Sequence, residues 1–173
     1  MPRVNTDEIV RTFGRWSNIN DTTIAGKIAA ERVHNYFNAD VTFNQETTLC
    51  GRSIIRNIIT AKEKSYYIEL HYISVENIDI AKNRVKERVA KGGHGIPDED
   101  IERRYAETFK NLKKVMPYCD KITFYDNSHK FHRFAVYENG KEKIIYPPIP
   151  KWFNKFAIVN PSSTQESDFS KRR

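Results

Sequence analysis

Residues 81–105 read AKNRVKERVAKGGHGIPDEDIERRY, and this stretch predicts two helices on either side of a glycine-rich turn. Apolar residues recur at helical spacing as far as Gly92. Pro97 and the three acidic residues after it are a typical helix start, because proline fits the first turn and acids favour the positive end of the helix dipole. The glycines between the helices favour a lid that hinges at residues 92–95.

Both helices carry arginines that such a lid could bring onto an anion. Arg84 and Arg88 share one face of the first helix, and Arg103 and Arg104 lie on the second. Arginines on a closing lid would neutralise the charge that grows on a transferred phosphoryl group. For a charge pattern alone, two solvated amphipathic helices are the commoner explanation, and the glycines tilt the interpretation towards a moving element. His94 is interpreted as a loop residue.

Along the rest of the chain, short apolar runs typical of strands alternate with segments that have helical periodicity. This alternation predicts an α/β fold with three α/β/α layers around a mainly parallel sheet. Ile24, Ile28, Val33 and Phe37 are expected to line the buried face of one helix, and Ser53 to cap the next. Predicted helices cover 7–14, 22–37, 53–64, 78–92 and 97–112; predicted strands cover 41–46, 67–74 and 121–125; a β-hairpin covers 131–137 and 141–146.

Composition limits the class of protein. A length of 173 residues with 39% hydrophobic content fits one globular domain, and no run approaches the ~18 apolar residues of a spanning helix. The two cysteines are far apart and no secretory signal is visible, so the sequence predicts a soluble cytoplasmic protein without a membrane partner. The net charge of +7 suits polyanionic ligands such as nucleotides and nucleotide sugars. Nucleic acid is the least favoured partner, since no stacking motif is present.

Three polar residues follow extended segments, where ligands gather in open α/β sheets. Asp7 opens a helix and could orient or deprotonate a hydroxyl, although a helix-capping aspartate is the simpler interpretation. Glu46 and Thr48 end the 41–46 strand and could hold sugar hydroxyls, or they could be polar residues of an ordinary turn. The histidines have no metal-ligand spacing, and no metal site is predicted.

The order of these pieces resembles the zeta-toxin-like P-loop kinases. The matching segments are VNTDEIVR at 4–11, ETTLCGRS at 46–53, RVKERVAKGGHGIPDEDIERRY at 84–105 and FYDNS at 124–128. The resemblance implies a P-loop kinase-like domain over residues 1–157, followed by a tail over 158–173 that its polar composition predicts to be disordered. It also implies ATP and Mg²⁺ as cofactors, UDP-N-acetylglucosamine or another small hydroxyl compound as the substrate, and an antitoxin as a protein partner.

On this resemblance Asp7 matches the catalytic base, Glu46 and Thr48 match substrate-binding positions, and the lid arginines Arg84, Arg88, Arg103 and Arg104 match the phosphate-binding region. The sequence departs from the family in two respects: it has no GxxxxGK[ST] motif, and Asn44 and Gln45 make the strand before Glu46 more polar than a buried strand of the family. We therefore expect an N-terminally truncated kinase domain that lacks its first strand and P-loop and transfers no phosphate by itself. The alternative is a non-catalytic protein that binds a nucleotide sugar or an antitoxin.

Overall fold

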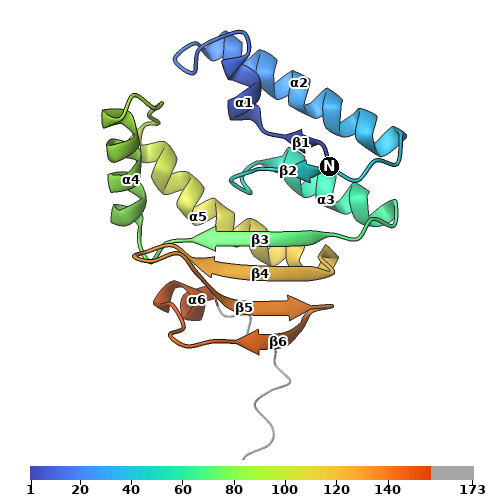
Figure 1. The fold of residues 1–173 in the computed structure, drawn as a ribbon, viewed down its shortest axis with the longest axis vertical. Helices are drawn as coiled ribbons and strands as arrows, with labels where there is room; N and C mark the ends of the chain where they lie inside the picture. The colour runs from blue at the N-terminus through green and yellow to red at the C-terminus, as the bar shows by residue number, and fades with distance from the viewer. Residues whose placement is uncertain (157–173) are drawn as a thin grey trace, which may run out of the picture.

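A computed structural model describes residues 1–156, and its largest element is a four-stranded sheet in the order β3-β4-β5-β6 (Figure 1). Its strands are Glu69–Ser74 (β3), Lys121–Asp126 (β4), His132–Glu138 (β5) and Lys141–Ile145 (β6). β3 and β4 are parallel, whereas β5 pairs antiparallel with both β4 and β6. The sheet is therefore mixed, and the expectation of a mainly parallel sheet is wrong here, because the hairpin adds two antiparallel strands without crossover helices.

A second, smaller pair of strands lies apart from this sheet. β1 (Arg3–Val4) and β2 (Asn44–Gln45) are parallel to each other. Figure 1 shows them beyond β3, with all of β1, β2, β3 and β4 running in the same direction. The strand predicted over 41–46 is thus reduced to two residues, and within residues 1–156 β2 pairs with β1 alone.

The predicted helices are present with small shifts at their ends. They are α1 (Thr6–Arg11), α2 (Ile19–Asn38), α3 (Arg52–Glu63), α4 (Ile78–Ala90) and α5 (Asp98–Val115). The structure adds two elements that the sequence did not predict: a 3₁₀ turn, η1, at Met116–Tyr118, and the helix α6 (Lys151–Phe156). Asparagine side chains cap α1, α2 and α4. Ser53 does not cap α3: the cap is Gly51, whose φ of 87° lies in the left-handed region that glycine tolerates. The tail prediction for 158–173 lies outside the described residues.

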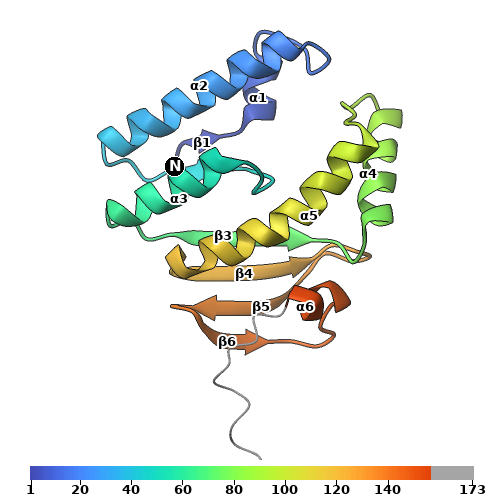
Figure 2. The ribbon, with the colours of Figure 1, turned by 180° about the vertical axis from the view of Figure 1, so that it is seen from behind.

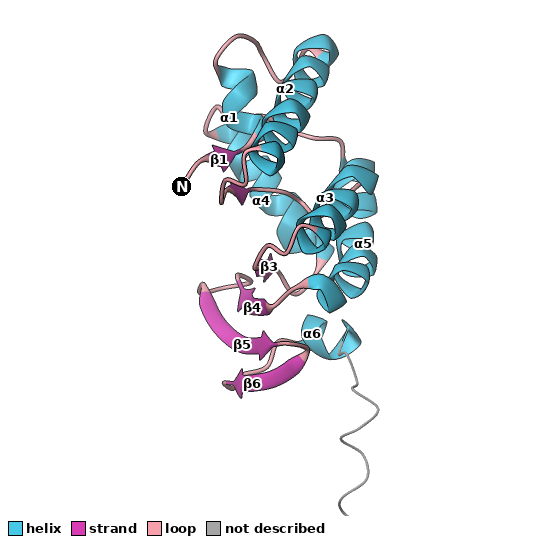
Figure 3. Ribbon diagram, turned by 90° about the vertical axis from the view of Figure 1, so that its right-hand side faces the viewer, coloured by secondary structure: helices cyan, strands magenta, loops and turns pink. Residues whose placement is uncertain are grey.

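The helices near the four-stranded sheet gather on one of its faces. Figure 2 shows α5 and α6 in front of the strands and α3 beyond the edge of β3, and the edge-on view of Figure 3 shows all three helices to one side. On the opposite face, Ile73 and Phe131 are each more than half exposed. Within residues 1–156 the sheet therefore has two layers rather than the expected three.

Two apolar cores follow from this arrangement. The larger lies between the sheet and α3, α5 and α6, and the smaller joins α1, α2 and β1. In α2 the buried residues are Ala25, Ala29, Val33 and Phe37, so the predicted face was wrong by one position at its start: Ile24 is 46% exposed. The alanines let α1 pack closely on α2. α3 contributes Ile54 to the large core and Ala61 to the small one, and so ties the two together.

Trp152 on α6 closes the large core. Its ring is almost fully buried and packs against Phe109, Phe134 and Phe153. The indole Nε1 donates a 2.8 Å hydrogen bond to Oδ1 of Asp126 on β4. A buried carboxylate is costly unless it is hydrogen-bonded, and this contact supplies one of its donors.

We expect Trp152→Phe to lower the free energy of unfolding by about 1–3 kcal/mol, because it keeps an aromatic ring but leaves the buried Asp126 one donor short. Urea denaturation followed by circular dichroism measures this. Tyr146→Phe is the control, since it removes a hydroxyl from a ring that is 49% exposed and should change stability by less than about 0.5 kcal/mol. Equal effects of the two substitutions would contradict a structural role for the indole hydrogen bond.

Candidate anion-binding site

A pocket of about 400 Å³ lies where β2, β3 and β4 end, beneath the helices α4 and α5. The carboxyl ends of parallel strands are where ligands bind in open α/β sheets. The wall contains two arginines and several hydroxyl groups but no carboxylate, so it favours an anion. Its lining comprises Thr47, Thr48, Ile73, Ser74, Val75, Ala81, Arg84, Ile96, Ile101, Arg104, Tyr105, Thr108 and Asn127.

The two arginines of this pocket differ in the hydrogen bonds of their guanidinium groups. Arg84 on α4 donates through Nη2 to the backbone carbonyl of Asn127, and a second carbonyl, that of Ser128, lies 3.5 Å from the same atom. Arg104 on α5 is only partly exposed, and within residues 1–156 its guanidinium has no hydrogen-bond or ion-pair partner. A guanidinium matches phosphate and carboxylate oxygens with two parallel N–H donors. Arg104 is therefore the cation best prepared to receive an anionic ligand.

The segment that carries Thr48 is held on α5. Nδ2 of the buried Asn111 donates to the carbonyl of Leu49 at 2.9 Å, and the backbone N–H of Gly51 donates to Oε1 of Glu107 at 2.8 Å. The Gly51 N–H, foremost among its donors, holds the pKa of the Glu107 carboxyl below its usual value. These contacts fix residues 47–51 beside Arg104. The pocket wall therefore depends on hydrogen bonds between residues that are more than 50 positions apart in the sequence.

Glu46 does not line this pocket. Its Oε2 accepts a 2.7 Å hydrogen bond from Nδ2 of Asn5 and forms an ion pair with Arg3. That pairing is the main cause of a raised pKa of the Arg3 guanidinium. Glu46 thus fastens the end of β2 to β1, whereas Thr48, two residues further on, lines the pocket.

Asp7 and Arg88 meet at the hinge rather than in the pocket. Arg88 Nε donates to the carbonyl of His94 at 3.0 Å, and Oδ2 of Asp7 lies 3.9 Å from Nε2 of His94. The His94 ring stacks on Trp16 with centroids 4.4 Å apart and an interplanar angle of 14°. His94, which the sequence suggested was an ordinary loop residue, therefore joins the hinge to the segment that follows α1.

Arg103 faces away from the pocket. Its guanidinium pairs with Asp100 at 2.7 Å and with Glu107 at 3.1 Å on the same helix. Of the four predicted lid arginines, Arg84 and Arg104 line this pocket, and Arg84 also lines a second pocket of about 330 Å³ together with Arg88.

The hinge glycines end α4 in a defined way. The N–H of Gly92 donates to the carbonyl of Val89, and the N–H of Gly93 donates to that of Arg88, which is the paired pattern of a Schellman motif. Gly92 has a φ of 82°, and a Cβ on Gly93 would lie 2.9 Å from the carbonyl oxygen of Arg88. Helix termination and close packing thus account for Gly92 and Gly93.

Sequence reasoning missed part of the pocket. Ser74 is the last residue of β3 and Asn127 directly follows β4, so the rule that placed Glu46 and Thr48 at a carboxyl edge could have found them. Tyr105 and Thr108 face the pocket from α5. The Tyr105 hydroxyl donates to the carbonyl of Val75 at 3.0 Å.

The donor set bears on the expected cofactors. The pocket offers hydroxyls and guanidinium groups, which fit phosphate oxygens, but Mg²⁺ prefers carboxylate oxygens, and none lines it. Across residues 1–156 no cluster of three or more His, Cys, Asp or Glu side chains could hold a metal ion. The described residues therefore fit a phosphate group and do not fit Mg²⁺.

Comparison with known proteins gives one partial match. An uncharacterized protein of Haemophilus influenzae is 38% identical over 81 residues, which are 47% of this chain. The chain covers 58% of the length of that protein. No protein-family profile matches the sequence. No solved structure matches the chain. Among the helices of residues 1–156, none combines the length and the apolarity needed to cross a membrane.

We expect the packing of His94 against Trp16 to lose stability as the pH falls. Burial, with Arg88 next in importance, lowers the pKa of His94 below its ordinary value of 6.5; Arg11 and Arg104 act in the same direction, and Asp7 opposes them. The folded state therefore favours the neutral ring. The unfolded chain takes up the proton first, so stability is complete above about pH 6.5 and is lost as the pH falls below that value.

His94→Phe should keep the ring stacked on Trp16 and remove this titration. Thermal unfolding between pH 7.5 and 5.5 tests it: the midpoint should fall more steeply for the natural chain than for His94→Phe. The surface substitution His129→Phe is the control and should leave the slope unchanged, because His129 is exposed. Parallel slopes for the natural chain and His94→Phe would show that His94 does not couple the hinge to pH.

Proposed function

We propose that this chain supplies the substrate-binding and lid parts of a zeta-toxin-like small-molecule kinase, and that its pocket binds the phosphate groups of a nucleotide sugar such as UDP-N-acetylglucosamine. The observation that carries the proposal is the unpaired guanidinium of Arg104 in a carboxylate-free pocket at the carboxyl ends of parallel strands. Thr48 and Arg84, both matched by the family resemblance, lie in the same wall.

The proposed ligand fits the chemistry of the wall. The diphosphate would take its charge-assisted hydrogen bonds from Arg104, and the hydroxyls of Thr48 and Thr108 would serve neighbouring oxygens. Arg84 has its guanidinium on backbone carbonyls in the ligand-free chain, and it would turn to the ligand only by exchanging those bonds. The nucleotide sugar itself is chosen by the resemblance, while the preference for an anion comes from the pocket.

Asp7 remains the proposed catalytic base. It lies at the start of α1 opposite the hinge, so an acceptor hydroxyl would have to reach the space between Asp7 and the hinge histidine. The nearest described partner of the Asp7 carboxylate in this space is Nε2 of His94, at 3.9 Å. ATP would supply the phosphoryl group, but the sequence has no GxxxxGK[ST] motif to cradle it and no Mg²⁺ site is described. We therefore propose ligand binding without phosphoryl transfer for residues 1–173 alone.

A binding protein without catalysis is the second candidate. It is favoured by the same combination of a formed anion pocket and a missing phosphate loop. An antitoxin-like protein is a possible partner under either function.

We expect Arg104→Ala to weaken binding of UDP-N-acetylglucosamine about 10- to 100-fold, since a charge-assisted hydrogen bond contributes about 1.5–3 kcal/mol. Isothermal titration calorimetry measures this. Arg103→Ala is a matched control on the same helix, because its guanidinium is already paired with Asp100 and Glu107 outside the pocket, and the affinity should change less than about threefold.

Two results would overturn these proposals separately. Equal losses of affinity in Arg103→Ala and Arg104→Ala would remove the pocket from the ligand-binding site. Turnover of Mg-ATP by the purified chain, followed by release of ADP, would show that phosphoryl transfer does not need the absent motif.

A further inference from the structure

The two parallel pairs of strands leave hydrogen-bonding groups unused where they face each other. In β2 and its flanks, the N–H groups of Asn44 and Glu46 donate to the carbonyls of Pro2 and Val4 at 2.9 and 3.0 Å. Successive residues of a strand turn their backbone groups to opposite edges, so those of Phe43, Gln45 and Thr47 point away from β1.

The edge of β3 shows the same pattern. The carbonyl of Ile68 accepts a hydrogen bond from the N–H of Lys121, and that of Ser74 accepts one from the N–H of Asn127. The backbone groups of the even-numbered residues of β3 therefore point towards β4. The backbone groups of Tyr67, Glu69, His71 and Ile73 therefore lie on the other edge. Within residues 1–156 the backbone groups on these two edges have no backbone partner.

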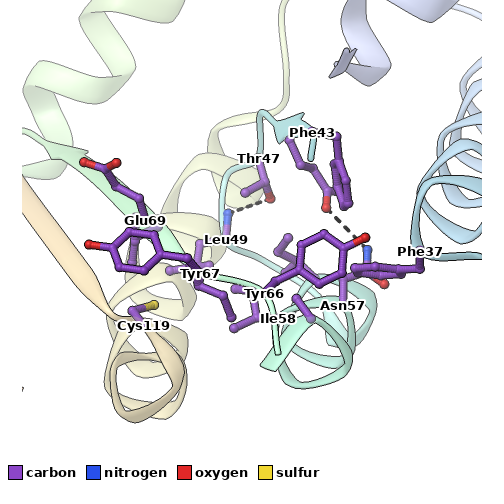
Figure 4. A pocket seen from close by; sticks show the side chains of 15 residues that line it. Phe37, Phe43, Thr47, Leu49, Asn57, Ile58, Tyr66, Tyr67, Glu69 and Cys119 are labelled. Atoms are coloured by element: carbon purple, nitrogen blue, oxygen red, sulfur yellow. Dashed lines mark hydrogen bonds between the residues drawn. The ribbon is translucent and has the colours of Figure 1, made fainter. Parts of the chain in front are cut away.

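An apolar cavity of about 160 Å³ lies between the two edges (Figure 4). Phe43 and Thr47 line it from the side of β2, and Tyr67 and Glu69 line it from the side of β3. Its floor is apolar and comes from the helical layer and its neighbours: Leu49, Ile54, Ile58, Leu70 and Cys119. No described helix covers the other face of the sheet (Figure 3).

The charge of the groove restricts what can fill it. Although the chain carries a net charge of +7, Glu69 is the one charged residue among those that line the cavity, and its carboxylate already pairs with Nζ of Lys121 at 2.9 Å. An acidic or basic segment would find no partner here and would lose its hydration. The complementary occupant is uncharged.

We infer that the groove between β2 and β3 binds an extended, uncharged segment of another polypeptide, which adds a parallel strand between the two edges and makes one continuous sheet. Strand addition of this kind takes its affinity from main-chain hydrogen bonds and its specificity from alternate side chains. Because helices lie on one face only, the segment should alternate between apolar residues towards the floor and uncharged polar residues towards solvent. The four free positions of β3 suit a strand of about five or six residues.

The test uses the full chain and the peptide acetyl-Thr-Val-Thr-Val-Thr-Val-amide as the probe. We expect saturable binding by calorimetry, together with slower hydrogen exchange at the amides of Gln45, Glu69, His71 and Ile73 and no change in the β5–β6 hairpin. A peptide with proline in place of each valine has the same alternation but lacks half of its donors, and it should not bind.

A substitution at His71 isolates the backbone contribution. His71→Pro removes a groove-facing N–H without breaking a bond to β4, and proline is tolerated on such an edge. His71→Ala removes the same side chain, with its contact to Tyr125, but keeps the N–H. The probe should bind about tenfold more weakly to His71→Pro than to His71→Ala, with both variants folded by circular dichroism.

Tethering the probe to the chain makes its binding detectable even if the free peptide binds weakly. The N-terminus lies beside β2 (Figure 1), so the same hexapeptide joined to Met1 through a flexible Gly/Ser linker can reach the groove at millimolar effective concentration. This fusion should protect the same four amides, and the proline peptide in its place should not. The inference is overturned if the tethered hexapeptide leaves these amides unprotected. It is also overturned if the unliganded chain already protects them in a dimer by light scattering, since a second copy would then occupy the groove.

Discussion

Every strand has two hydrogen-bonding edges, and in this chain the parallel strands β2 and β3 each have a backbone partner on one edge within residues 1–156. This constraint separates the small β1–β2 pair from the main sheet and makes α3 the element that joins the two apolar cores. It also sets the position of the anion pocket. Because the strands of both pairs run in the same direction, their carboxyl ends meet on the same side, and α4 and α5 close over that side.

The pocket is held together by α5 more than by any other element. The helix anchors residues 47–51 through Asn111 and Glu107, supplies Arg104, and buries Phe109 and Leu112 in the large core. A cation held on a buried helix is positioned with little entropy left to lose when a ligand binds. By contrast, α4 has no buried residue, and its contacts run through Arg84, Lys82 and the hinge. Movement of the lid is therefore expected in α4, with α5 as the fixed side.

Local signals predicted the helices α1 to α5, the strands β3 and β4 and the Asn139-Gly140 hairpin, because helical periodicity, proline with acids, and a turn with two positive φ values are set by neighbouring residues. The layer count and the sheet composition were not predictable in this way, since they depend on which distant edges pair. The candidate site shows the same difference between local and long-range contacts. Thr48 and Arg104 share a pocket because loop 47–51 and α5 bond across the fold. Arg88 and Arg103 instead bond to groups within six residues in sequence, and Glu46 pairs with Arg3 on the neighbouring strand β1.

The groove and the anion pocket are adjacent, and Thr47 lines both. A strand added in parallel between β2 and β3 would end at the same carboxyl edge as its neighbours, so the residues after it would enter the pocket beside Arg104. Backbone N–H groups of a chain that turns there are further donors for an anion. Strand addition and anion binding should then favour each other, because the same segment would complete the sheet and add donors to a pocket that in residues 1–156 has a single unpaired guanidinium.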